Sequence, residues 1–137
     1  MGAAGRCRRD VVLIVEDDPN IRTALAEVLD EYGYETLTEC DGEAALELLD
    51  NLPPASDDAP SVILVDVMMP GMSGYEFVAA LRVRPAAASV PVIFMSAGPR
   101  PWWRSEDGHR FLDKPLRIDR LLAAIRNAAP VDNTRLN

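Results

Sequence analysis

Unbroken apolar runs alternate along this chain with segments in which apolar residues recur at helical spacing. The runs at residues 11–15, 62–65 and 90–95 contain no polar alternation, which is typical of strands buried on both faces of a sheet. Residues 34–38 and 110–112 are interpreted as two shorter strands. Because helical segments lie between strands, the pattern predicts an α/β fold: an open sheet of parallel strands with right-handed crossovers, covered by helices on both sides.

Capping residues mark where the helices begin. Asp18 before Pro19 is a typical N-cap with proline at the first helical position, and Asp41 opens a second helix. Ser73 with Glu76 three residues later forms a capping box for a third helix. The residues expected to face the core are Ile21, Leu25, Val28 and Leu29; Ala45, Leu46, Leu48 and Leu49; Tyr75, Phe77, Val78 and Leu81; and, in a last helix over residues 117–129, Ile118, Leu121, Leu122 and Ile125.

Polar residues stand where the predicted strands end. Glu16 and Asp17 follow the first strand, Asp66 the third, Ser96 the fourth and Lys114 the fifth. In open parallel sheets the carboxyl ends of the strands meet at one edge, where ligands bind. We therefore expect these five side chains to converge.

Together these residues suit the transfer of a dianionic, planar group. Three carboxylates at one edge repel one another unless a cation lies among them, and oxygen ligands without His or Cys favour Mg²⁺ or a similar hard ion. Lys114 adds a fixed positive charge, a carboxylate can attack the transferred group in line, and Ser96 can donate a hydrogen bond to the transferred oxygen. Neither GxxxxGK[ST] nor GxGxxG occurs, so bound nucleotide is not expected. For Asp66 taken alone, a helix cap or a solvated strand end remains an alternative.

Length and charge restrict the classes of protein. The 137 residues suit one domain, expected over residues 10–129, with a flexible leader at 1–9 and a polar tail at 130–137. Fourteen basic against 22 acidic residues give a net charge of −8, which argues against direct nucleic-acid or membrane binding. No stretch approaches the roughly 20 apolar residues of a membrane span, and the N-terminus lacks a signal-peptide core, so a cytoplasmic location is expected. Two cysteines and one histidine leave little material for a disulfide framework, a His-based metal site or a Ser/His/Asp apparatus.

Four motifs occur in order: VLIVEDDPNIR, LVDVMMPGMSG, VIFMSA and DKPL. Through these motifs the chain resembles, over residues 11–129, the receiver domain of response regulators in bacterial two-component systems. The resemblance implies a flavodoxin-like, doubly wound sheet of five parallel strands in the order 2-1-3-4-5. It implies a signalling domain rather than an enzyme, with a histidine kinase or a phosphotransfer protein as phosphoryl donor and an unidentified downstream protein as target. Whether the chain forms a homodimer is left open.

The same resemblance assigns roles to residues. Asp66 would be the phosphoacceptor. Asp17 would bind Mg²⁺ directly, Glu16 would help through water, and Asp66 with the backbone carbonyl of Met68 would complete the protein ligands. Lys114 stands at the position of the family's lysine, before a proline that is usually cis.

The family's switch positions are occupied by Ser96 and Phe111. In the family the switch aromatic turns inward when the switch hydroxyl moves toward the phosphoryl group. Met68 and Gly98 occupy positions that in relatives help to place the attacking water. Because neither offers a side-chain hydrogen bond, we expect slow self-dephosphorylation.

The chain departs from the family between residues 97 and 113, where relatives have a fourth amphipathic helix. The segment AGPRPWWRSEDGHRFL is short and contains Pro99 and Pro101, which would remove helix donors and clash with the preceding turn. The fourth helix is therefore expected to be shortened or missing. Trp102 and Trp103 either cover the sheet at this place or anchor a partner.

Two other functions share features with this sequence. An enzyme of the haloacid dehalogenase type also uses a strand-end Asp with Mg²⁺, but it needs a second Asp two positions later, where this chain has Met68. The other alternative is a pseudo-receiver, an interaction module not controlled by phosphorylation. The irregular segment around Trp102 favours it, whereas the intact acidic set with Ser96 and Lys114 argues against it.

Overall fold

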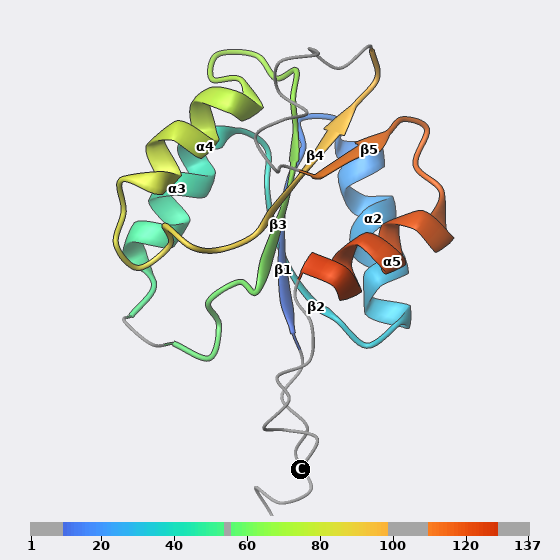
Figure 1. Ribbon diagram of the computed structural model, residues 1–137, viewed down its shortest axis with the longest axis horizontal. Helices are drawn as coiled ribbons and strands as arrows, with labels where there is room; N and C mark the ends of the chain where they lie inside the picture. Colours follow the sequence, from blue (N-terminus) through green and yellow to red (C-terminus); the bar gives the residue numbers. More distant parts are fainter. Residues whose placement is uncertain (1–9, 54–55, 99–109, 129–137) are drawn as a thin grey trace, which may run out of the picture.

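Five parallel strands form a single sheet in the order β2-β1-β3-β4-β5, as the resemblance implies (Figure 1). The structure is a computed structural model and describes residues 10–53, 56–98 and 110–128. In chain order the elements are β1 (Val11–Val15), α2 (Pro19–Glu31), β2 (Glu35–Glu39), α3 (Gly42–Asn51), β3 (Val62–Asp66), α4 (Gly74–Arg82), β4 (Val92–Ser96), β5 (Arg110–Asp113) and α5 (Ile118–Ala128). The alternation of strands and helices has therefore given the doubly wound arrangement.

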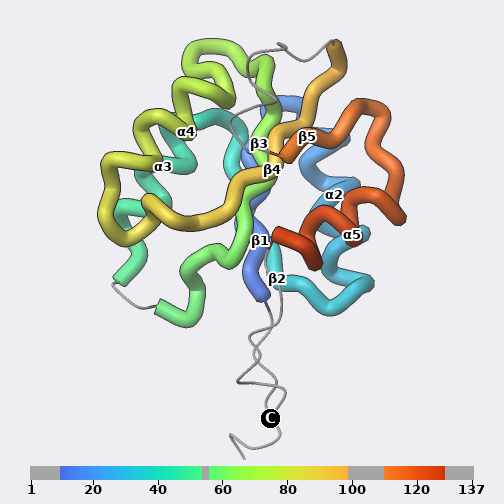
Figure 2. Tube along the Cα trace, viewed as in Figure 1, coloured from blue at the N-terminus to red at the C-terminus, as the bar shows by residue number. Residues whose placement is uncertain are grey.

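Helices cover both faces of the sheet, with α3 and α4 on one side and α2 and α5 on the other (Figures 1 and 2). Strands β1, β3 and β4 are buried at every position, whereas the edge strands β2 and β5 are partly exposed. Successive strand residues point to opposite faces, so each of the buried strands β1, β3 and β4 supplies both core layers. The α3/α4 layer includes Leu13, Val15, Ile63, Val65, Phe77, Leu81 and Phe94, and the α2/α5 layer includes Val12, Ile14, Leu25, Leu29, Leu64, Ile93, Leu121 and Ile125.

The predicted helix starts are confirmed. The Asp18 carboxylate accepts from the backbone N–H groups of Asn20 and Ile21 at 2.8 and 3.3 Å. Asp41 caps α3 in the same way, and Ser73 with Glu76 forms the capping box of α4. These caps satisfy backbone donors that a helix leaves without an internal partner.

Strand boundaries differ from the prediction by one or two residues. Tyr34 does not belong to β2, because its backbone N–H closes the end of α2 by donating to the Leu29 carbonyl at 3.0 Å. The fourth strand begins at Val92 rather than at residue 90, because the N–H of Val90 donates to Ala87 in the preceding turn. Strand β3 extends to Asp66, β4 to Ser96 and β5 to Asp113, so polar residues end these three strands.

Several predictions fall outside the described residues. They are the leader at 1–9, the tail at 130–137, and the shortened or missing fourth helix with Trp102 and Trp103. Within the described ranges, none of the helices has the length and apolar character needed to cross a membrane.

Candidate functional site

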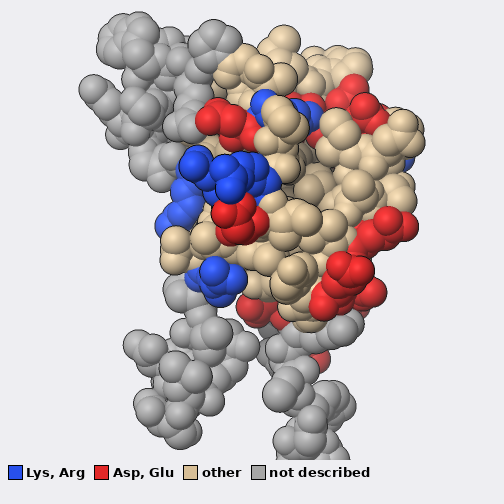
Figure 3. Space-filling view, turned by 90° about the vertical axis from the view of Figure 1, so that its right-hand side faces the viewer, with Lys and Arg blue, Asp and Glu red and all other residues tan. Residues whose placement is uncertain are grey.

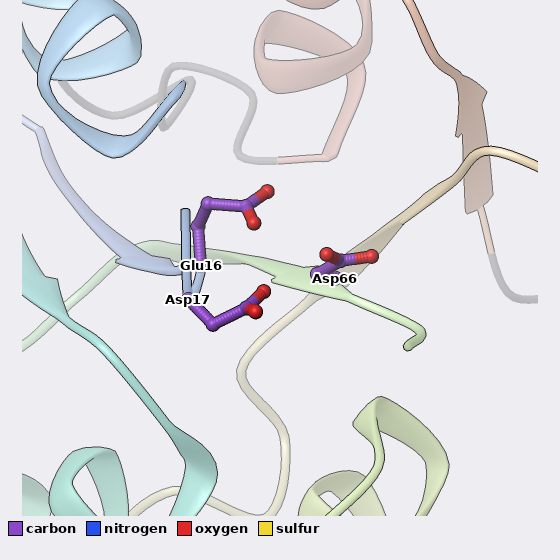
Figure 4. Close-up of side chains that lie close together, drawn as sticks. All are labelled: Glu16, Asp17 and Asp66. Atoms are coloured by element: carbon purple, nitrogen blue, oxygen red, sulfur yellow. The ribbon is translucent and has the colours of Figure 1, made fainter. Parts of the chain in front are cut away.

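Three carboxylates meet at the carboxyl edge of the sheet. Glu16 and Asp17 follow β1, and Asp66 is the last residue of β3 (Figure 4). One carboxylate oxygen from each residue lies within 4.8 Å of the others. Glu16 and Asp66 are only 1% and 6% exposed, whereas Asp17 is exposed. We call these three residues the acidic cluster.

Lys114 reaches the acidic cluster from the end of β5. Its Nζ donates to Glu16 Oε1 at 2.8 Å and to Asp66 Oδ2 at 3.0 Å, and its side chain is 15% exposed. Its backbone N–H donates to the Ser96 carbonyl at 2.8 Å, and the Lys114–Pro115 peptide bond is cis, as the resemblance implied. A buried carboxylate is costly unless it is paired, so this ammonium is what allows Glu16 and Asp66 to lie close together.

Burial and pairing also shift the pKa values of these groups. Burial is the largest influence on the Glu16 carboxyl and raises its pKa, against the opposing effect of the hydrogen bond from Lys114. Burial by itself would lower the pKa of Lys114, but the hydrogen bonds to Glu16 and Asp66 and their negative charges outweigh it and raise that pKa. Lys114 is therefore a firmly charged ammonium at neutral pH.

The backbone around Asp66 is held from two directions. The Val67 N–H donates to the Met95 carbonyl at 2.9 Å, and the Met68 N–H donates to Asp66 Oδ1 at 3.2 Å. Gly74 at the start of α4 approaches so closely that an added Cβ would lie 2.5 Å from the Asp66 carbonyl oxygen. Only a residue without a side chain fits there unless the loop moves.

Ser96 on β4 and Phe111 on β5 make contacts with residues outside the acidic cluster. Ser96 is buried at the end of β4, and its hydroxyl donates to the Gly98 carbonyl at 3.1 Å. Phe111 on β5 stacks on Phe94, its direct neighbour on β4, with ring centroids 5.2 Å apart. Phe94 also contacts Tyr75 on α4, at a centroid distance of 5.0 Å. This row of rings connects the edge strand β5 with the start of α4.

Sequence reasoning missed the role of Arg22. From α2, its Nη1 donates to the Glu16 carbonyl oxygen at 2.8 Å, while the Glu16 N–H donates to the Glu39 carbonyl at 3.1 Å. These bonds fix the peptide that carries both Glu16 and Asp17. The only signal in the sequence is a basic residue one helical turn after the Asp18 cap, which is too common to single out.

The donor set of the acidic cluster fits a hard divalent cation. It consists of carboxylate oxygens, the ligand type that Mg²⁺ prefers, and it contains no imidazole or thiolate. The fold and this site define a doubly wound α/β domain with an acidic cation site and a partly buried lysine at the carboxyl edge of its sheet.

The chain belongs to the response regulator receiver domain family, whose model matches residues 12–126. It is 35% identical over 121 residues to Response regulator PleD of Caulobacter vibrioides, covering 85% of this chain and 25% of PleD. It is 30% identical over 123 residues to Protein PilG of Pseudomonas aeruginosa, covering 87% of each chain. The structure of the Vibrio cholerae chemotaxis protein CheY4 superimposes with a TM-score of 0.77 at 30% identity, covering 88% of this chain and 98% of CheY4. The chain thus spans a quarter of PleD.

Proposed function

We propose that this chain is a receiver domain that takes a phosphoryl group from a histidine kinase or a phosphotransfer protein onto Asp66. The observation that carries this proposal is the position of Lys114, whose ammonium bridges Glu16 and Asp66 at 2.8 and 3.0 Å in a buried corner. A lysine with no chemical role would have no reason to lie between the carboxylates at the ends of two other strands, β1 and β3.

In the proposed reaction a carboxylate oxygen of Asp66 attacks the phosphorus of the donor. The new O–P bond forms as the bond to the donor atom breaks, and the donor keeps that electron pair. The Lys114 ammonium has three N–H groups, so it can hold Glu16 and Asp66 and still reach a phosphoryl oxygen. The negative charge on the phosphoryl oxygens is the main obstacle to such a transfer. A fixed cation stabilises this charge and so lowers the activation barrier.

The residues proposed to hold Mg²⁺ are Asp17 directly, Glu16 through water, Asp66, and the backbone carbonyl of Met68. When bound, the ion supplies positive charge to the phosphoryl oxygens and offsets the repulsion among the three carboxylates. The exposure of Asp17 supports its role as a direct ligand, since an incoming hydrated ion reaches it without displacing the buried Glu16.

The proposed switch uses Ser96 and Phe111. The Ser96 hydroxyl would exchange the Gly98 carbonyl for a phosphoryl oxygen, which pulls on the segment after β4. Phe111 packs against Phe94, and Phe94 stands two residues before Ser96 on β4. A shift of β4 would therefore be transmitted to β5. The downstream protein would bind the changed surface at β5 and the segment before it, where Trp102 and Trp103 are predicted either to cover the sheet or to anchor a partner.

The phosphorylated form is proposed to be long-lived, with no enzymatic activity beyond this self-phosphorylation and slow self-dephosphorylation. The side chain of Met68 is 76% exposed and apolar, and Gly98 has no side chain, so neither can hold an attacking water. We expect the acyl phosphate to persist for minutes or longer. Its loss within seconds, without a phosphatase, would contradict this.

Intact mass after incubation with acetyl phosphate and Mg²⁺ tests the proposal. The wild type and Asp58→Asn, which changes an exposed carboxylate in a turn, should each gain one phosphoryl group. Asp66→Asn should gain none, and neither should the wild type when Mg²⁺ is chelated. If the folded wild type shows no mass change, the pseudo-receiver that binds its partner without phosphorylation becomes the better account.

A further inference from the structure

Met68 lies in the loop after β3, beside the acidic cluster, and its side chain is 76% exposed. Its backbone N–H donates to Asp66 Oδ1 at 3.2 Å. Lys114 holds the other oxygen of the same carboxylate, Oδ2, at 3.0 Å. Met68 is therefore a direct neighbour of the proposed phosphoacceptor, and its sulfur is open to reagents in solution.

The other methionines that the structure describes are less exposed. Met69 is 9% exposed, and Met95 on β4 is completely buried. Met72 is partly buried against the α3/α4 core layer, and an added Cβ on Gly42 would lie 2.8 Å from its Sδ. A reagent must reach a thioether sulfur before it can oxidise it, so Met68 should be modified first.

A peroxide converts the thioether of methionine to a sulfoxide. The sulfur lone pair attacks one peroxide oxygen, the O–O bond breaks, and the other oxygen leaves as hydroxide. The hydroxide then removes the proton from the new S–OH group as water. Sulfur is oxidised by two electrons and the peroxide is reduced by two. A reductase that uses a dithiol returns the thioether, with a disulfide and water as the other products.

The charge of the molecule favours an uncharged oxidant. The chain has 22 acidic and 14 basic residues, and Figure 3 shows acidic groups at several places on the side of the molecule formed by α2 and α5. The three carboxylates of the acidic cluster add negative charge close to the loop of Met68. This charge repels an anionic oxidant, whereas hydrogen peroxide carries no charge.

Oxidation changes what the Met68 side chain can do for a water molecule. A thioether sulfur is only a weak acceptor, whereas the oxygen of a sulfoxide is a strong one. A water that donates to the sulfoxide is held beside the phosphoryl group, with a lone pair free to attack phosphorus. A new O–P bond forms as the bond from Asp66 to phosphorus breaks. The carboxylate keeps that electron pair, and both protons of the water leave with the phosphate.

We propose that Met68 is an oxidation site, at which a peroxide shortens the lifetime of the phosphorylated form by placing a sulfoxide oxygen beside Asp66. This inference rests on the proposed function, since the lifetime is that of the acyl phosphate on Asp66. It gives the same site a second, redox input: the unmodified protein keeps its phosphoryl group, and the oxidised protein loses it.

Tandem mass spectrometry of peptides locates the oxidation. The unphosphorylated full chain is treated with increasing hydrogen peroxide, with an untreated sample as the control for handling. Met68 should gain one oxygen at a dose that leaves the three less exposed methionines unmodified. This result does not require phosphorylation, so it is independent of the proposed function. Oxidation of a buried methionine before Met68 would overturn the inference.

The lifetime is measured on protein that is oxidised, freed of peroxide, phosphorylated with acetyl phosphate and then freed of the donor. By intact mass, the oxidised wild type should lose its phosphoryl group about tenfold faster than the untreated wild type, the effect of about one hydrogen bond in the transition state. Met68→Leu has no sulfur at this position, so peroxide should not change its rate. Met72→Leu is the matched control and should keep the response of the wild type.

Met68→Gln separates the hydrogen bond from other effects of peroxide. Its amide oxygen is a strong acceptor, so this variant should match the oxidised wild type without any oxidant. Equal rates for the oxidised and the untreated wild type would overturn the inference and leave the proposed function intact. A folded wild type that takes up no phosphoryl group would instead contradict the proposed function, and the effect on lifetime with it.

Discussion

The acidic cluster and the loop after β3 depart from an ordinary protein surface in opposite ways. In the acidic cluster, charged groups are buried: Glu16 and Asp66 are 1% and 6% exposed. In the loop, an apolar side chain, Met68, is 76% exposed. Buried charge is informative by itself because it is costly, whereas a single exposed apolar side chain is common. Met68 becomes informative through its sulfur and through the contact of its N–H with Asp66.

Asp66 joins the two regions, since Lys114 holds its Oδ2 and the N–H of Met68 holds its Oδ1. The two regions are built from different parts of the fold. The acidic cluster is fixed by the ends of buried strands, whereas the Met68 side chain stands on a loop at the surface. Substitutions should therefore affect one region while leaving the other intact.

Lys114→Ala should have the largest effect. Loss of the ammonium removes the fixed cation from the acidic cluster, and we expect phosphorylation by acetyl phosphate to slow about a hundredfold, as when one charge-stabilising group is removed from an active site. Oxidation of Met68 by peroxide should persist, because the exposure of its side chain does not depend on the ammonium. Initial rates by intact mass check the first expectation and peptide mass spectrometry the second. Arg117→Ala, which removes an exposed cation nearby, is the control and should keep the wild-type rate.

Gly74→Ala should disturb the acidic cluster through the backbone. The new Cβ would lie 2.5 Å from the Asp66 carbonyl oxygen, so the loop after β3 must move, at a cost of about 1–3 kcal/mol in the free energy of unfolding. Gly98→Ala is the matched control, since nothing lies within 4 Å of its added Cβ. Urea unfolding measures both variants. Equal stability of the two would contradict the close approach at Gly74.

Arg22→Met tests whether the peptide between Glu16 and Asp17 needs its support from α2. Removing a group that orients a metal ligand typically lowers metal affinity by about tenfold or more. We expect the Mg²⁺ affinity of Arg22→Met to fall by an amount at the lower end of that range. The shifts of the backbone amides of residues 16–18 during a Mg²⁺ titration report the affinity. Arg126→Met, an exposed arginine on α5, should bind Mg²⁺ as the wild type does. An unchanged affinity in Arg22→Met would show that β1 alone positions the two carboxylates.

Asp50→Asn should have the smallest effect, because it lies far from both regions and acts at the surface. Arg84 donates to Asp50 at 2.8 and 3.1 Å, and this hydrogen bonding lowers the pKa of Asp50 below its ordinary 3.8. A carboxyl with a lowered pKa in the folded state stabilises the fold above pH 3.8 and loses that contribution as the pH falls through the lowered value. The urea midpoint of the wild type should therefore slightly exceed that of Asp50→Asn at pH 7, and the difference should vanish at lower pH. A difference that is constant with pH would exclude the ion pair as its cause.

Most of the fold was predictable because its signals are local. Unbroken apolar runs predicted the buried strands, and Asp18, Asp41 and Ser73 marked three helix starts from their own side chains. The strand order came with the family resemblance. The errors are also local. Tyr34 was predicted in a strand, but its N–H donates to the Leu29 carbonyl and closes α2. Ile118 was predicted to face the core, but as the first residue of α5 it is 49% exposed.

The candidate site also has a part that the sequence predicts and a part that it does not. The convergence of Glu16, Asp17, Asp66 and Lys114 follows from their positions at strand ends, and the structure brings them together. The contact of Arg22 with Glu16 depends on the path of α2, and the exposure of Met68 depends on the path of the loop after β3. No spacing in the sequence encodes these paths.

The central claim, that Asp66 is the phosphoacceptor, is tested most directly by locating the phosphoryl group. Borohydride reduces an aspartyl phosphate to homoserine, so peptides from phosphorylated and reduced protein reveal which carboxylate was modified. We expect homoserine at position 66, with Asp17 and Glu16 unmodified. Reduction at another carboxylate, or at none while the protein carries a phosphoryl group, would contradict it.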